Sequence, residues 1–183
     1  MNWLKTSLLL IAAFLAVFWE AAFGVVRHLL GAQIDLLPPL LVYAGLSTGW
    51  ISICLLSFVG GLLFDSLSAN PLGVSVLPLL AVGSLIYLLR EFVLRDQTLT
   101  HLVLGLFASA AAPVLTLILL LTTGHGPMLG WGTLWQLTVM TLGGGLVAPL
   151  VFALFDWLHG ALIHARTAET SFRPDREIRR GRS

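Results

Sequence analysis

Two acidic side chains stand inside long apolar runs of this sequence, and any chemistry would be expected there first. Glu20 lies in the run that begins at Trp3, and Asp65 closes the run that contains Gly60 and Gly61. An ionised carboxylate inside a membrane costs at least about 2.5 kcal/mol, so it needs a partner, a hydrated cavity or a proton. Both residues are therefore candidates for proton transfer or solute binding, and each also has a structural interpretation.

Glu20 is the leading polar candidate inside a predicted membrane span. No Lys or Arg lies in any apolar core of the sequence to pair with it. Its alternative interpretation is structural, because Glu20 precedes Val26 by only six residues and its side chain can reach water at the outer interface. The sequence leaves both interpretations open.

Asp65 stands four residues after Gly61, and this spacing places both on one face of a helix. Such a face is a notch beside a carboxylate, which allows another helix to approach closely. The residues that follow, Asn70, Pro71 and Gly73, have the composition of a turn. We favour a structural role, in which Asp65 caps or braces this turn, over a proton or ligand site.

Motifs of known catalytic chemistry are missing from the sequence. It contains no phosphate-binding Gly-Lys loop, no His-Glu-x-x-His and no Gly-x-Ser-x-Gly. The single cysteine, Cys54, excludes a disulfide within one chain, and His101 and His125 have no second metal ligand at helical spacing. His159 and His164 are five apart, which is also poor ligand geometry. We therefore expect no enzyme activity, no cofactor and no metal.

The composition is that of a membrane protein. Of the 183 residues 57% are hydrophobic and only 10% are charged, and the mean hydropathy is +0.94. A soluble domain is normally about one quarter charged. Because one helix needs about 20 apolar residues to cross a bilayer, the chain has room for roughly six spans and no separate soluble domain. We predict an all-α polytopic membrane protein.

The apolar runs and turn signals divide the chain into six predicted helices. Pro38 and Pro39 suit the first turn of a helix, and the first span is expected to be retained rather than cleaved as a signal peptide. A long run is interrupted at 47–50, and this break is the least obvious boundary. The predicted spans cover residues 3–26, 36–47, 51–67, 74–89, 101–121 and 134–158. Together they form a transmembrane domain over residues 1–163, followed by a flexible Arg-rich tail over 164–183.

The distribution of basic residues predicts the orientation. With six spans, nine of the ten Lys and Arg residues fall on one side and only Arg27 falls on the other. Basic residues are enriched on the cytoplasmic side of membrane proteins, so both termini are expected to be cytoplasmic. The nine residues are Lys5, Arg90, Arg95, Arg166, Arg173, Arg176, Arg179, Arg180 and Arg182.

Small residues indicate where helices pack closely. Gly45 and Gly49 form a GxxxG pair, and 143–145 is a run of three glycines. Such patterns favour helix–helix contact within the chain or self-association, although they are common in membrane helices.

Residues 57–73, Ser-Phe-Val-Gly-Gly-Leu-Leu-Phe-Asp-Ser-Leu-Ser-Ala-Asn-Pro-Leu-Gly, resemble the bacterial rod shape-determining MreD family. That family shows Gly, then Asp four residues on, then a turn that ends in Leu-Gly. The resemblance extends over about residues 36–90 and rests elsewhere on size and topology. Ser57 stands where an additional Gly is often found, and the Arg-rich tail is longer than the family pattern.

The resemblance implies a non-enzymatic subunit of the cell-elongation machinery in the bacterial inner membrane. Its direct partner would be an MreC-like membrane protein, and its indirect partners would be MreB, RodA and a class B penicillin-binding protein. Its motif positions correspond here to Gly61, Asp65, Asn70, Pro71 and Gly73. Nothing in the sequence suggests a nucleic-acid partner.

Two other function classes remain. The MreD family is similar in fold to the six-helix substrate-binding components of energy-coupling-factor vitamin transporters, so a solute-binding subunit is the main alternative. Such a subunit needs polar and aromatic residues that converge on one cavity, and the predicted outer loops offer few: Arg27, Gln33, Asp35, Asn70, His125 and Trp131. An intramembrane enzyme would require Glu20 or Asp65 to meet a second catalytic group.

Overall fold

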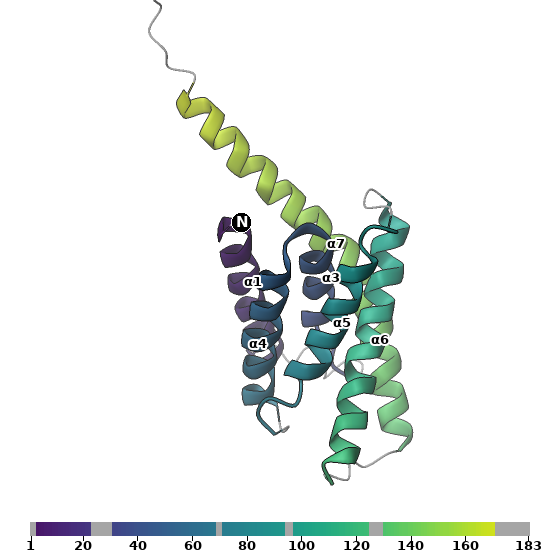
Figure 1. The fold of residues 1–183 in the computed structure, drawn as a ribbon. Helices are drawn as coiled ribbons and strands as arrows, with labels where there is room; N and C mark the ends of the chain where they lie inside the picture. Colours follow the sequence, from purple (N-terminus) through teal and green to yellow (C-terminus); the bar gives the residue numbers. More distant parts are fainter. Residues whose placement is uncertain (1–2, 23–30, 69–70, 94–96, 125–129, 171–183) are drawn as a thin grey trace, which may run out of the picture. The chain divides into compact units, whose positions relative to one another are not determined.

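The regular structure of the described residues is entirely helical (Figure 1). The computed structural model describes residues 3–22, 31–68, 71–93, 97–124 and 130–170, with side chains as far as residue 161 except that of 159. These residues form six helices and no strand, which confirms the predicted all-α class. The helices are α1 (Trp3–Ala22), α3 (Leu37–Ser47), α4 (Trp50–Leu67), α5 (Val76–Leu89), α6 (Thr98–Thr122) and α7 (Trp131–Thr170).

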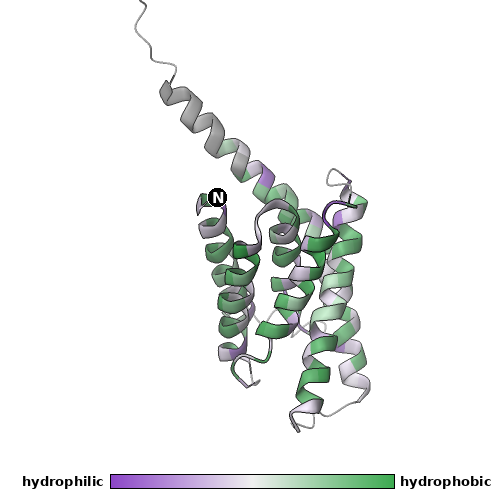
Figure 2. Ribbon diagram, in the orientation of Figure 1, coloured by the Kyte–Doolittle hydropathy of each residue, from purple (hydrophilic) through white to green (hydrophobic). Residues whose placement is uncertain are grey.

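Four of these helices are long and apolar enough to cross a membrane, namely α1, α4, α6 and the part of α7 up to Leu158. The helices α3 and α5 have 11 and 14 residues, which correspond to about 16 Å and 21 Å of rise. Apolar residues dominate the coloured parts of the six helices (Figure 2). Large apolar side chains such as Phe18, Phe107 and Leu150 are exposed on the helices, as expected of surfaces that face lipid.

The break in the long apolar run lies where the sequence predicts it. Thr48 and Gly49 have extended backbones, and the amide of Thr48 donates to the carbonyl of Ala44 at 3.0 Å, which ends α3. The next helix then begins at Trp50. The observed bounds 37–47 and 50–67 differ from the predicted ones by one residue.

The chain divides into two compact units, Met1–Phe152 and Ala153–Ser183. The helix α7 begins in the first unit and ends in the second. Because α7 ends at Thr170, it continues past the predicted span end at 158 and past the predicted domain boundary at 163. The tail beyond Thr170 lies outside the described residues. The contacts discussed below all belong to the first unit.

The core of the first unit is built around α3, α4 and α5. The helix α4 packs against α1 and α5, and α3 packs against α5 and α6. Gly45 allows α3 and α5 to approach closely, because a Cβ atom there would lie 2.8 Å from the Cγ2 atom of Ile86. Gly49, its predicted GxxxG partner, faces open space, so only one residue of that pair serves helix packing.

The run of three glycines in α7 lies at a helix contact. A Cβ atom on Gly145 would lie 2.5 Å from the Cγ atom of Leu106, and one on Gly143 would lie 2.8 Å from Ile34. The backbones of α6 and α7 also approach each other closely, because a Cβ atom on Gly105 in α6 would lie 3.1 Å from the carbonyl oxygen of Gly144.

Polar contacts define two opposite ends of the first unit. At one end, Thr6 in α1 bonds Ser52 in α4, and Arg90 lies 4.0 Å from the ring centre of Tyr87. We call it the basic end, because it carries Lys5 and Arg90. At the other end, called the acidic end, lie Glu20, Asp35 and Asp65 with the turns that precede α3 and α5 (Figure 1).

Candidate functional site

Asp65 joins the end of α4 to the turn before α5. Its side chain is 1% exposed, and its Oδ2 atom accepts hydrogen bonds from the amides of Gly73 at 2.8 Å and Ser75 at 3.0 Å. Its Oδ1 atom accepts a third bond, at 2.5 Å, from the Ser75 hydroxyl. We call these three residues the Asp65 brace. Its geometry is that of a turn anchor.

Glycines make the brace possible at two positions. Gly73 has a φ of +90°, a backbone conformation that side chains other than glycine strongly disfavour. Gly61 lies against the first residue of α5, because a Cβ atom on Gly61 would lie 3.0 Å from both the Cα and N atoms of Val76. The notch expected beside Asp65 is therefore filled by the start of α5. Pro71 is exposed, and Asn70 lies outside the described residues.

Glu20 has a partner that the sequence did not reveal. Its Oε1 atom accepts a hydrogen bond of 2.6 Å from the amide of Leu36, the residue that precedes α3. Its Oε2 atom lies 3.5 Å from the Nε2 atom of Gln33, which is a long contact. A carboxylate at a helix N-terminus satisfies a free amide and interacts favourably with the helix dipole.

Asp35 accepts a hydrogen bond from the next amide at the start of α3. Its Oδ1 atom accepts a bond of 2.9 Å from the amide of Leu37. Because Pro38 and Pro39 have no amide proton, the start of α3 contains no further donor in need of a partner. Glu20 and Asp35 thus complete the N-terminus of α3 together.

Burial raises the pKa of Asp35 from its usual 3.8 to about 6, and the hydrogen bond from Leu37 acts in the opposite direction. Asp35 lies in the turn before α3 and is 8% exposed. Its Oδ2 atom has no hydrogen bond among the described residues. Asp35 therefore has an acceptor available for a further donor.

Two glutamines fix the turn before α3 to α7. The amide of Gln33 donates to the Oε1 atom of Gln136, and the Nε2 atom of Gln136 donates back to the carbonyl of Gln33, both at 3.1 Å. The paired bonds use both ends of one side-chain amide, so they hold the turn in a single orientation.

A cavity of about 250 Å³ lies beside these groups at the acidic end. We call it the polar cavity. Apolar side chains of α4, α5, α6 and α7 form most of its wall. Its polar lining residues come from the turn before α3, the Asp65 brace, α6 and α7: Gln33, Asp35, Ser75, Thr116, Thr133 and Gln136.

The structure brings some of the predicted candidates together and separates others. Glu20 and Asp35 meet at α3, whereas Asp65 belongs to the separate brace before α5. No set of three or more His, Cys, Asp or Glu side chains in the described part of the chain is arranged to hold a metal ion. His101 stacks on Phe152 at 3.7 Å between ring centres.

The sequence did not indicate Ser75 or Gln136 as site residues. Each lies in or beside an apolar segment and bonds a residue that is distant in the sequence. Ser75 bonds Asp65, 10 positions away, and Gln136 bonds Gln33, 103 positions away. The only signal in the sequence was a single polar residue, inside an apolar helix for Gln136 and directly before one for Ser75. A scan against protein families, a comparison with curated proteins and a comparison with solved structures found no match to this chain.

Proposed function

We propose that this chain is a non-enzymatic membrane scaffold of the bacterial cell-elongation machinery that acts with an MreC-like partner. The proposal rests on the resemblance of residues 57–73 to the MreD family. Its main structural support is that the motif residues Gly61, Asp65 and Gly73 belong to one braced junction between α4 and α5.

The chemistry of the brace favours a structural role over a catalytic one. Both oxygens of Asp65 already accept hydrogen bonds, and the carboxylate is buried. A proton carrier or ligand site needs an oxygen that can exchange partners, whereas a rigid junction needs all its acceptors occupied. A rigid junction suits a protein whose role is to present a fixed surface to another membrane protein.

The proposed location is the bacterial inner membrane, with both termini in the cytoplasm and the acidic end facing outward. Lys5 and Arg90 at the basic end support this orientation. After replacement of Cys54, single cysteines at Gly31 or Gly124 should react with an impermeant reagent in intact spheroplasts. Labelling at Glu91 instead would reverse the orientation.

The test of function is affinity purification of the tagged chain in mild detergent from its own host. The proposal predicts recovery of an MreC-like protein, with RodA, a class B penicillin-binding protein and MreB as indirect partners. The Asp65→Leu variant should recover less of it than the wild type at equal amounts in the membrane. Recovery of ATPase and coupling subunits of a transporter in its place contradicts the proposal.

The polar cavity favours a second candidate, a solute-binding transporter subunit. Its polar residues come from several separate segments, as a solute site requires. The free oxygen of Asp35 suits a small solute that donates hydrogen bonds, and no Lys or Arg is among the described lining residues. Host uptake assays with and without the gene distinguish the candidates, because only a transporter subunit makes uptake of one solute depend on this chain.

A further inference from the structure

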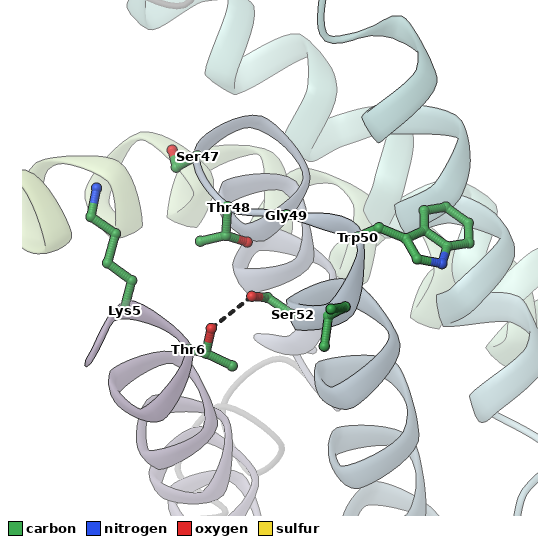
Figure 3. A pocket seen from close by; sticks show the side chains of 8 residues that line it. Lys5, Thr6, Ser47, Thr48, Gly49, Trp50 and Ser52 are labelled. Atoms are coloured by element: carbon green, nitrogen blue, oxygen red, sulfur yellow. Dashed lines mark hydrogen bonds between the residues drawn. The ribbon is translucent and has the colours of Figure 1, made fainter. Parts of the chain in front are cut away.

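A second cavity, of about 370 Å³, lies at the basic end between the start of α1 and the junction of α3 with α4 (Figure 3). We call it the basic-end cavity. Neither the motif of residues 57–73 nor the proposed scaffold role involves it. The described residues of its lining include one cation, four hydroxyl groups and no acidic side chain: Lys5, Thr6, Ser47, Thr48 and Ser52, with Gly49, Trp50 and Ile51.

The wall of this cavity holds a hydroxyl proton that has no acceptor. Thr6 and Ser52 are each 5% exposed, and their hydroxyl oxygens lie 2.7 Å apart (Figure 3). One hydroxyl donates to the other in this bond, so the second proton remains unused. No further acceptor for either group lies among the described residues. A buried donor of this kind is satisfied by an acceptor that enters the cavity.

The start of α4 adds backbone donors at the same place. Its capping residue is Gly49, which has no side chain to accept from the first amides of the helix. The amides of Trp50 and Ile51 have no hydrogen-bond partner among the described residues. Free amides at a helix N-terminus, together with the helix dipole, favour an anion.

Lys5 supplies the charge. It forms no ion pair within the described part of the chain, and it lines the cavity together with Ser47 and Thr48 (Figure 3). The hydroxyl of Thr48 already donates to the carbonyl of Ala44. The remaining donors are the ammonium group, the Ser47 hydroxyl, the Thr6–Ser52 pair and the amides of α4. All of them suit a phosphate oxygen.

We propose that the basic-end cavity binds the phosphate group of an anionic phospholipid. The cavity opens at the end of helices that cross the membrane, where Trp50 packs at 5.7 Å against Tyr87, a pairing typical of the headgroup region. In the proposed orientation this region faces the cytoplasmic leaflet, which is rich in anionic lipid. The lipid phosphate would accept hydrogen bonds from Lys5 of α1 and from the amides at the start of α4, and would thereby link α1 to the α3–α4 junction.

The experiment titrates short-chain phosphatidylglycerol into the purified full chain in detergent and follows thermal unfolding. Phosphatidylglycerol should raise the unfolding temperature saturably, and phosphatidylcholine should not. Lys5→Gln should weaken the apparent affinity for phosphatidylglycerol roughly tenfold, because one charge-assisted contact is lost. Lys5→Arg should retain most of the affinity.

Arg90→Gln is the matched control, since Arg90 is a cation of the same end that does not line the cavity. Equal weakening by Lys5→Gln and Arg90→Gln would mean general attraction of anions and would overturn the proposal, as would no stabilisation by phosphatidylglycerol. A further titration uses inorganic phosphate alone. Saturable stabilisation that depends on Lys5 and competes with phosphatidylglycerol would support the phosphate site with free phosphate as its source.

Discussion

Ser75 gives Asp65 two hydrogen bonds, one from its amide at 3.0 Å and one from its hydroxyl at 2.5 Å. Ten residues separate the pair, and the turn between them connects α4 to α5. Asp65 is fully buried and also accepts a hydrogen bond from the amide of Gly73. Its carboxylate therefore fixes the conformation of the turn through which α4 leads into α5. The proposed scaffold role depends on this junction.

Replacement of Asp65 should show a rank order. Asn keeps an oxygen that can accept from both amides, and the Ser75 hydroxyl can rotate to accept from the new NH2 group, so Asp65→Asn should retain much of the stability. Leu accepts nothing, and each unsatisfied amide costs about 1–3 kcal/mol. Thermal unfolding in detergent should therefore order the variants as wild type, Asn, Leu.

Ser75→Ala is the control for this series, because it removes only the hydroxyl bond and leaves the amide bond in place. It should cost less than Asp65→Leu. Equal loss for Asn and Leu, with both variants present in the membrane, would show that the charge itself is required and would remove the brace interpretation.

Gly61 should tolerate no large side chain. A Leu at this position would overlap the backbone of Val76 and separate α4 from α5, at a cost of about 1–3 kcal/mol or more. Leu63 on the same helix is only half-buried, so Leu63→Ala should change stability by about 1 kcal/mol or less. Folded yield and recovery of the partner compare the two variants, and equal results for both would contradict close packing at Gly61.

Ser57 and Ser52 form a matched pair on α4. Both side chains are buried, but Ser52 bonds Thr6 whereas the Ser57 hydroxyl has no partner among the described residues. Ser52→Ala should destabilise the chain by about 1 kcal/mol, and Ser57→Ala should be neutral or slightly stabilising. Unfolding temperatures measured side by side test this, and a larger loss for Ser57→Ala would reveal a partner that the structure does not contain.

Asp35 should make stability depend on pH. Its pKa is raised from 3.8 to about 6, so the folded state favours the protonated form. The corresponding stability is fully present below about pH 4 and is lost as the pH rises through about 6. The wild type should therefore unfold at a higher temperature at pH 5 than at pH 7.5, and Asp35→Asn should reduce this difference.

Glu20, the acidic group that faces Asp35 from α1, remains in the Asp35→Asn variant, so part of the pH dependence can persist. Glu91→Gln is the control, because Glu91 is exposed beyond the end of α5. It should keep the wild-type profile. An unchanged profile in Asp35→Asn would show that Asp35 does not titrate in this range.

Local features of this fold were predictable from the sequence. The break at Thr48 and Gly49, the prolines at the start of α3 and the turn after Asp65 all depend on residues close together in the chain. Hydrophobic length located the six helices, although α6 begins at Thr98 rather than 101 and α7 continues to Thr170. Apolar composition marks a membrane span but does not mark where the helix itself stops.

The partners of the polar side chains were not predictable. Glu20 accepts a hydrogen bond from an amide 16 residues away. Because nearly every residue has a backbone amide, no residue type in the sequence indicates which one donates this bond. Gln136 stands in an apolar helix, and nothing close to it in the sequence indicates that it bonds the distant turn at Gln33. The polar cavity depends on the same distant contacts, which is why its lining looked sparse in the sequence.

The most direct test of the proposed function is removal of this chain from its own host, with cell width and shape measured by microscopy before and after depletion. The account predicts rod-shaped cells that widen and become round on depletion, and it predicts that the wild type and Asp65→Asn restore rods while Asp65→Leu restores them poorly. Cells that keep their rod shape without the chain, and that lose uptake of one solute instead, would contradict the scaffold role and establish the transporter subunit.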